Sequence, residues 1–168
     1  MAGGLVRQGV CRMMFHNAMR ASGQSSDAHT YWRFLATAPS FSPSYGVYGL
    51  SAYTIGMFES TDSTGTDVCI GSTVTASSMY SAVYLPQAAC DGSQTTYWFS
   101  SGVSSTPQWL QVQLPSPKNV KSVYLVFGAE GAYYPSSANI QFSDDGVSWT
   151  TKKTISLTNG VYSYSLAL

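Results

Sequence analysis

The sequence AACDGSQTTYW at residues 88–98, followed by PQWLQVQL at residues 107–114, decides how this chain folds. Asp91-Gly92 is a turn signal, because an aspartate bonds its own backbone and a glycine accepts a positive φ. Serine and threonine hydroxyls surround this turn at residues 93, 95 and 96. In the second segment Trp109 and two glutamines alternate with Leu110 and two other aliphatic residues, which is the period of a strand with one buried face. The two segments therefore predict an oxygen-rich turn fixed against an aromatic-anchored core strand.

A second stretch, IQFSDDGVSW at residues 140–149, predicts a strand, a tight turn and a return strand. Asp145-Gly146 between alternating apolar residues is one of the strongest short-range hairpin signals. Turn signals recur regularly along the chain, and the composition is rich in tyrosine, serine, threonine and glycine. This combination favours an all-β sandwich over a helical fold.

Together these segments resemble the discoidin family, also called the coagulation-factor type C or galactose-binding-like domain. The residues that carry the resemblance are Asp91, Gly92, Thr96, Trp98, the run 108–114, the run 141–146 and Trp149. It covers residues 72–151 and implies a jelly-roll β-sandwich. Members of the family mostly bind glycans, some bind lipid headgroups or proteins, and they are usually non-catalytic.

Two earlier segments resemble strands that normally lie near the C-terminal end of this family's domain. They are YWRFLAT at residues 31–37 and GLSAYTI at residues 49–55. Because both come first here, we interpret the domain as circularly permuted. Permuted versions of this kind resemble domains of tail-associated proteins in bacteriophages and prophages. By analogy, we expect a virion structural protein on the tail or particle surface, serving host-surface glycan adhesion or assembly. The alternative is a freestanding lectin-like carbohydrate-binding module.

Charge and hydropathy argue against two classes of partner. Eight basic and eight acidic side chains leave no basic excess for nucleic acid. No apolar run is long enough to span a membrane, and residues 5–19 are interrupted by polar side chains, so no signal peptide is expected. For the virion protein that the resemblance implies, the expected location is the virion, after synthesis in the host cytoplasm.

Three cysteines, Cys11, Cys69 and Cys90, have no metal-type spacing. We expect free thiols, with Cys90 as a small buried hydrophobic residue, which suits a reducing cytoplasm. One disulfide is the alternative.

Residues 1–27 differ from the domain expected at residues 28–168. They carry three arginines, four of the six methionines and no acid before Asp27. Methionine-rich apolar faces adapt to partner surfaces, so we expect a docking arm that binds other virion proteins, in a homo-oligomer. An extension without a binding role is the alternative.

The resemblance also implies one structural Ca²⁺ in the Asp91 turn. Its ligands would be the Ala88 carbonyl, Asp91, Ser93 and Thr96. Calcium takes six to eight oxygens, yet the position where the family usually adds a glutamate is Thr54. Asp91 could equally cap the turn and bond Thr96 locally.

Glycan contacts are expected on the loops. Aromatic side chains can stack on the apolar faces of sugar rings. The candidates are Tyr80, Tyr84, Tyr133 and Tyr134, with Glu130 as a hydrogen-bond acceptor, and loop packing is the alternative role for each. Trp98, Trp109 and Trp149 resemble the core aromatic residues of the family, so we assign these three, together with Trp32, to the core.

No catalytic constellation is recognisable in the sequence. His16 and His29 are expected outside the core, without a nucleophile at motif spacing. Asp144 and Asp145 are adjacent in a predicted turn, where turn formation explains them better than acid–base catalysis. We therefore expect no enzymatic activity.

Overall fold

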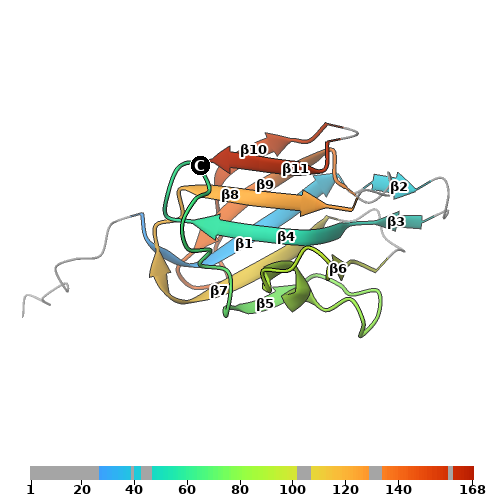
Figure 1. Ribbon diagram of the computed structural model, residues 1–168, viewed down its shortest axis with the longest axis horizontal. Coiled ribbons are helices and arrows are strands. Elements are labelled where there is room, and N and C mark those ends of the chain that lie inside the picture. The colour runs from blue at the N-terminus through green and yellow to red at the C-terminus, as the bar shows by residue number, and fades with distance from the viewer. Residues whose placement is uncertain (1–26, 39, 43–46, 102–106, 129–133, 159–160) are drawn as a thin grey trace, which may run out of the picture.

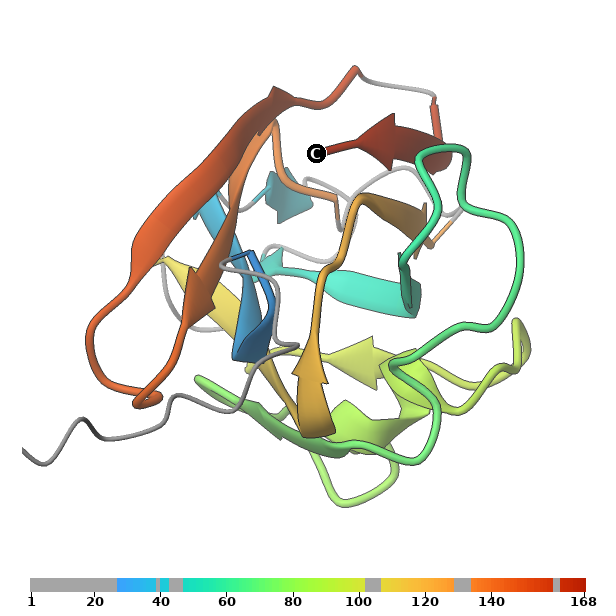
Figure 2. The same cartoon turned by 90° about the vertical axis from the view of Figure 1, so that its left-hand side faces the viewer.

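A computed structural model describes residues 27–38, 40–42, 47–101, 107–128, 134–158 and 161–168. Two antiparallel sheets pack face to face as a β-sandwich, which confirms the predicted fold class (Figures 1 and 2). The expected arm lies outside the described residues, apart from Asp27. Within the described part, no helix has the length and apolar character needed to cross a membrane.

The larger sheet has five strands in the order β10-β9-β1-β7-β5. Their bounds are β1 (His29–Ala38), β5 (Thr73–Ala76), β7 (Gln108–Lys118), β9 (Ser137–Ser143) and β10 (Thr150–Ser156). The smaller sheet has four strands in the order β11-β8-β4-β6. Its strands are β4 (Ser51–Phe58), β6 (Trp98–Phe99), β8 (Ser122–Phe127) and β11 (Ser163–Ala167). A short pair, β2 (Ser40–Ser42) and β3 (Val47–Gly49), and one 3-10 helix, η1 (Pro86–Cys90), complete the fold.

Strand β1 is the central strand of the larger sheet, between β7 and β9. Trp32 pairs with Val112 on one side and with Phe142 on the other. The segment 31–37 therefore belongs to the same sandwich as 109–114, as the resemblance predicted.

The predicted hairpin is also present. Strands β9 and β10 are antiparallel neighbours, and Gly146 in their turn has a φ of +72°. Glycine adopts this left-handed conformation without the steric cost that a side chain would bring.

The core lies between the two sheets and is built on large side chains. Trp32, Phe34 and Trp98 are fully buried, and the Phe34 ring lies 5.7 Å from that of Phe127. Burying each such side chain contributes roughly 1.5–3 kcal/mol. The indole nitrogen of Trp98 donates to the Ser78 carbonyl at 2.9 Å, so its polar atom is satisfied.

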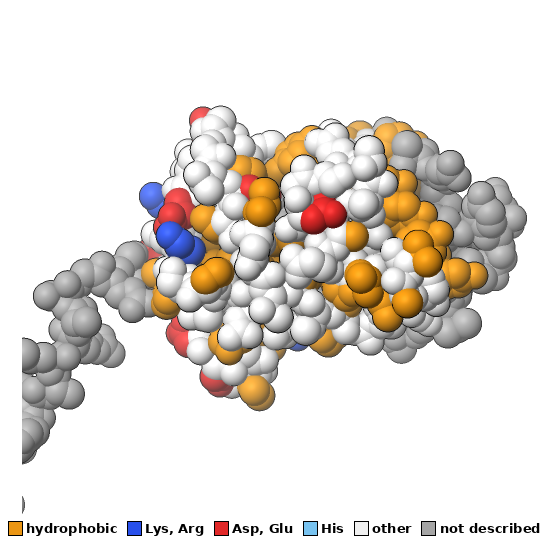
Figure 3. Space-filling model, turned by 60° about the horizontal axis from the view of Figure 1, so that its bottom comes forward, with side chains coloured by type: hydrophobic (Ala, Val, Ile, Leu, Met, Phe, Trp, Pro, Cys, Tyr) orange, Lys and Arg blue, Asp and Glu red, His pale blue; other side chains and the backbone are white. Residues whose placement is uncertain are grey.

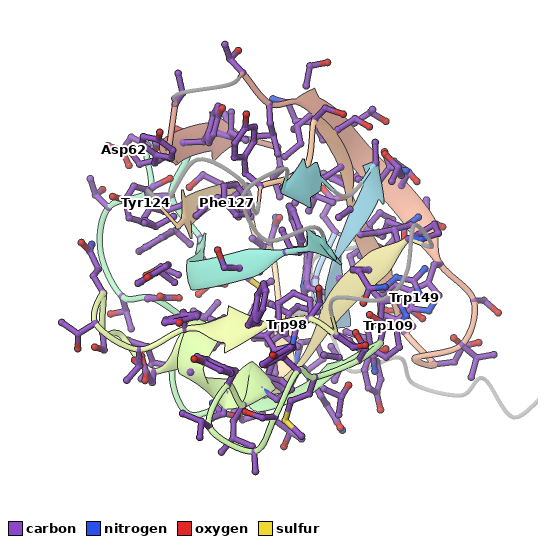
Figure 4. The ribbon with its side chains drawn as sticks, turned by 90° about the vertical axis from the view of Figure 1, so that its right-hand side faces the viewer. Asp62, Trp98, Trp109, Tyr124, Phe127 and Trp149 are labelled. Carbon is purple, nitrogen blue, oxygen red and sulfur yellow. A yellow bond between two sulfur atoms is a disulfide. The ribbon has the colours of Figure 1, made fainter. Side chains whose placement is uncertain are left out.

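The assignment of Trp109 and Trp149 to the core is wrong. Both are only partly buried, and they lie on the outer side of the five-stranded sheet (Figure 4). In β7 the inner positions are Leu110, Val112 and Leu114. Because successive side chains of a strand point to opposite faces, Trp109 must face outward.

The cysteines differ from the expectation of free thiols. Cys69 and Cys90 form a disulfide between Cα atoms 5.5 Å apart, and both residues are buried. The loop after β4 returns to η1 and brings the two thiols together. Asp67 holds this loop, since its Oδ1 accepts from the backbone N–H groups of Met57 and Cys69, both at 2.9 Å. Burial raises the pKa of Asp67. Because these two thiols are paired, the cysteines no longer favour a reducing compartment.

Candidate ligand-binding site

The turn after η1 forms as the sequence predicts. Asp91 is the C-cap of η1, and Gly92 follows with a φ of +79°. The Asp91 carboxylate accepts the Ser93 N–H at 2.8 Å and the Thr96 hydroxyl at 2.6 Å. An aspartate that bonds the backbone two residues later is a standard way to hold a turn.

The four expected calcium ligands lie in η1 and this turn, but their chemistry fits a hydrogen-bonded turn better than a calcium site. Asp91 is the single carboxylate, and both of its oxygens already accept hydrogen bonds. The Ser93 hydroxyl is engaged with that of Thr95 at 2.9 Å. Among the described residues, no three His, Cys, Asp or Glu side chains gather where they could hold a metal ion. These contacts favour the hydrogen-bonded turn over the Ca²⁺ site that the resemblance implies, and the predicted ion itself is untested.

A hollow of about 400 Å³ opens beside the turn. One part of its wall is aromatic and aliphatic, and the other carries an amide, hydroxyls and the Asp91 carboxylate. The lining residues are Val83, Tyr84, Leu85, Gln87, Ala88, Asp91, Thr95, Thr96 and Tyr97. Apolar and polar walls that meet in one concave surface are characteristic of small-ligand sites.

Five rings form a continuous cluster at this end of the sandwich, which we call the aromatic cluster. It consists of Tyr53, Tyr80, Tyr84, Tyr97 and Phe99. Tyr84 lies 4.9 Å from Tyr97, which stacks on Tyr53 at 4.6 Å between ring centroids. Tyr80 lies 5.3 Å from Phe99 and 6.1 Å from Tyr84. The cluster therefore presents adjoining rings beside the hollow.

Exposed apolar side chains surround the cluster. Tyr80 is 60% exposed and Val83 is 79% exposed, and Met79 and Leu85 are exposed as well. Hydrophobic side chains gather in patches on the face that carries β5, η1 and β6 (Figure 3). Exposed apolar groups around a hollow are typical of a binding surface.

The predicted ligand residues separate into three groups. Tyr80 and Tyr84 come together in the aromatic cluster. Tyr134 is only 8% exposed and belongs to the core, so its expected place on an exposed loop is wrong. Glu130 and Tyr133 lie outside the described residues.

Three members of the aromatic cluster were not predicted from the sequence: Tyr53, Tyr97 and Phe99. The alternation of side chains along a strand would have placed Tyr97 and Phe99 at the surface, because Trp98 between them points into the core. Its neighbours on an extended strand must then project to the other side, toward the surface.

His29 does not lie outside the core, where it was expected. It is buried, it stacks on Phe142 at 3.8 Å, and its Nδ1 lies 2.9 Å from Asp144 Oδ1. His29 therefore joins the edge of the core to the β9–β10 turn. Its expected position outside the core is wrong, and His16 lies outside the described residues.

Comparison with protein-family models gives a match. The family model described as "F5/8 type C domain" matches residues 73–165, which is more than half of the chain. No curated protein and no solved structure matches. The matched range begins at β5, so β1 and β4 precede it and complete the two sheets.

Proposed function

Because the chain belongs to the F5/8 type C domain family, we propose that it is a non-catalytic binding module for a carbohydrate, held in the hollow beside Tyr84. Domains of this family are typically binding modules without catalytic activity. The observation that carries the proposal is the meeting of the aromatic cluster with a polar wall in one hollow.

A sugar ring matches both walls. Its apolar C–H face can pack on the Tyr84 ring, which contributes apolar area with a fixed geometry. Its hydroxyls can then exchange hydrogen bonds with Thr95 and Gln87, which line the same hollow. They can also donate to the Asp91 carboxylate, because an ionised carboxylate has about four acceptor positions and the turn uses two of them. Hydrogen bonds to an ionised acceptor are stronger than those between neutral groups. A neutral hexose is therefore the expected ligand class for this hollow.

A glycan array followed by calorimetry tests the proposal. Tyr84→Ala should weaken binding of the best neutral glycan at least tenfold, because the stacking surface is lost. Tyr84→Phe keeps the ring and should retain most of the affinity. Tyr124→Ala is the matched control, since Tyr124 is a partly exposed tyrosine of β8 away from the hollow (Figure 4). Equal binding by wild type and Tyr84→Ala would exclude this site.

We also propose that the module serves in a bacteriophage particle, with residues 1–27 docking it onto other virion proteins in a homo-oligomer. The strand order supports this proposal, since β1 and β4 precede the family-matched range, as a permuted domain requires. The Cys69–Cys90 disulfide suits a protein that acts outside a reducing cytoplasm, as a released particle does. A freestanding lectin-like module is the competing proposal.

Deleting residues 1–26 separates these two proposals. A docking role predicts a soluble, folded sandwich that no longer enters the particle or oligomer. If the shortened protein still assembles normally, the docking arm is ruled out and the freestanding module is favoured.

A further inference from the structure

The outer face of the five-stranded sheet carries a row of polar side chains across its strands. Arg33 on β1 is opposite Gln111 on β7 and Gln141 on β9. Thr75 on β5 pairs with Gln111, and Thr151 on β10 pairs with Gln141. Side chains at directly opposite positions lie on the same face, about 4.5–5.5 Å apart. Arg33 therefore stands in the middle of an amide and hydroxyl row.

Arg33 is held in place by neutral groups. Its Nε and Nη2 donate to Gln141 Oε1 at 2.9 and 2.6 Å, and its guanidinium carbon lies 4.1 Å from the centre of the Trp149 ring. Gln141 is itself fixed by a 3.1 Å hydrogen bond to the Thr151 hydroxyl. This bracing orients the guanidinium before any ligand arrives.

The charge of Arg33 has no carboxylate partner within the described part of the chain. The acids that contact basic side chains there are Glu59, which pairs with Lys118, and Asp144, which pairs with His29. Partial burial lowers the pKa of Arg33, but an arginine stays protonated at physiological pH. Within the same residues Nη1 makes no hydrogen bond. A fixed cation with free donors thus faces outward.

Trp109 provides an apolar surface beside this cation. It lies on β7 two residues from Gln111, which is opposite Arg33, so the two positions are diagonal neighbours. Diagonal positions on one sheet face are about 7–8 Å apart, roughly the width of a sugar ring with its substituents. Trp109 and Trp149 both lie on this outer side in Figure 4, and both are partly exposed.

We propose that this face is a second binding site, specific for a carboxylated sugar, with the carboxylate on Arg33 and the ring on Trp109. A guanidinium donates to a carboxylate with matched geometry, and the neighbouring Gln111 amide can bind sugar hydroxyls. A doubly charged phosphate would require at least one cation in addition to Arg33. A peptide adding as a strand would need free backbone groups, but those of β1 and β7 are used within the sheet. The site shares no residue with the hollow at Tyr84 and is independent of it.

Calorimetry on the full chain tests this site with matched probes. Trigalacturonic acid should bind at least tenfold more tightly than its methyl ester, which keeps the rings but lacks the charge. Sialyllactose and lactose form a second pair of acid and neutral probes. Comparing this pair with the first shows whether the site prefers sialic acids or uronic acids. Arg33→Gln should abolish the preference for the acid, and Trp109→Ala should weaken binding of the acid at least tenfold. Both pairs of probes are compared in the Tyr84→Ala background as well, because the hollow proposed for neutral glycans would otherwise contribute heat from the ester and from lactose; in that background the preference of this face for the acid should remain.

Arg33→Gln removes the stacking contact with Trp149, so its fold is checked by melting temperature. If Arg33→Gln unfolds, Gln111→Ala tests the site instead, because Gln111 lies opposite Arg33 but does not orient its guanidinium. Gln111→Ala should weaken binding of the acid threefold or more. Equal binding of acid and ester, no binding of either acid, or unchanged binding by Trp109→Ala would each overturn the proposal. Self-association that Trp109→Ala abolishes would instead identify the face as a contact between copies of this chain and would also overturn it.

Discussion

Asp145 is the acceptor on which the β9–β10 turn depends. Its Oδ1 takes the Ser143 hydroxyl at 2.8 Å and the backbone N–H groups of Val147 and Ser148 at 2.8 and 2.7 Å. These hydrogen bonds favour the ionised form, so they hold the pKa of Asp145 well below its usual value.

A depressed pKa in the folded state makes the stability contribution of Asp145 dependent on pH. The contribution is present above the unfolded pKa, about 3.9, and is lost as the pH falls toward the folded value. Asp145→Asn should therefore lower the free energy of unfolding at pH 7, and its difference from wild type should narrow below about pH 4. Urea unfolding across this range measures the difference. A difference in unfolding free energy between wild type and Asp145→Asn that stays constant with pH would contradict the stabilising role of the ionised Asp145 carboxylate.

The tryptophans give a second prediction at single positions. Trp98→Ala should lower the free energy of unfolding by about 3–5 kcal/mol, because it empties a fully buried site. Trp109→Ala should cost about 1 kcal/mol or less, since that ring is partly exposed on the outer face. Urea denaturation of both variants checks the contrast, and similar losses would place Trp109 in the core after all.

Single-residue environments could be predicted where they follow from alternation. The pattern of residues 107–114 identified Leu110, Val112 and Leu114 as one face, and these residues are the inner face of β7. The error at Trp149 has a different origin. The contact of Trp149 with Arg33 depends on the pairing of β1 with β9. That pairing brings together residues far apart in sequence, such as Arg33 and Gln141, which are hydrogen-bonded across 108 positions. No local period contains that information.

Among the connecting segments, the Asp91 turn has two interpretations that a melting experiment can distinguish: a turn held by hydrogen bonds or a cation site. With its single carboxylate already engaged, we expect the same melting temperature in Ca²⁺ and in chelator. Asp91→Ala should lower stability by about 1 kcal/mol under both conditions, the usual contribution of such hydrogen bonds. A melting temperature that rises with Ca²⁺ would instead establish the cation, because a ligand that binds the native state alone stabilises it.

The disulfide joins the loop after β4 to η1, across 21 positions of sequence. Reduction, or Cys69→Ala with Cys90→Ala, should lower the free energy of unfolding by about 2–4 kcal/mol, since a crosslink restricts the unfolded chain. Chemical denaturation with and without reductant measures this. A Cys11→Ser variant serves as the control and should respond to reductant as wild type does.

This disulfide could not have been predicted from cysteine spacing. Three cysteines allow three pairings, and spacing does not say which thiols the fold brings together. The aromatic cluster was found in part for a related reason. Tyr80 and Tyr84 are close in sequence, but Tyr53 reaches them from β4 through the pairing of β4 with β6.

Considered as one folding unit, the chain depends on strands from outside the family-matched range. A fragment of residues 73–165 lacks β1, which separates β7 from β9, and β4, which separates β8 from β6. We expect this fragment to remain unfolded and residues 27–168 to fold. Circular dichroism and the dispersion of amide proton resonances report the outcome. A folded 73–165 fragment would show that β1 and β4 are dispensable.

The general architecture was predictable because turn signals and alternation recur along the chain, whereas the place of β1 came from resemblance alone. Nothing within residues 29–38 specifies pairing with strands that begin at residues 108 and 137. Such long-range pairings are decided by the whole set of inner side chains rather than by local sequence.

The central position of β1 has a consequence for biosynthesis. Strand β1 leaves the ribosome before either of its partner strands, and β9, the later of the two, ends only at Ser143. At synthesis rates of about 5–20 residues per second, the strand waits roughly 5–20 s for that partner. During this interval Trp32 and Phe34, which are fully buried in the finished protein, lack the complete sandwich that covers them. The nascent chain therefore offers a hydrophobic segment to chaperones, and the yield of folded protein should depend on them more than its final stability suggests.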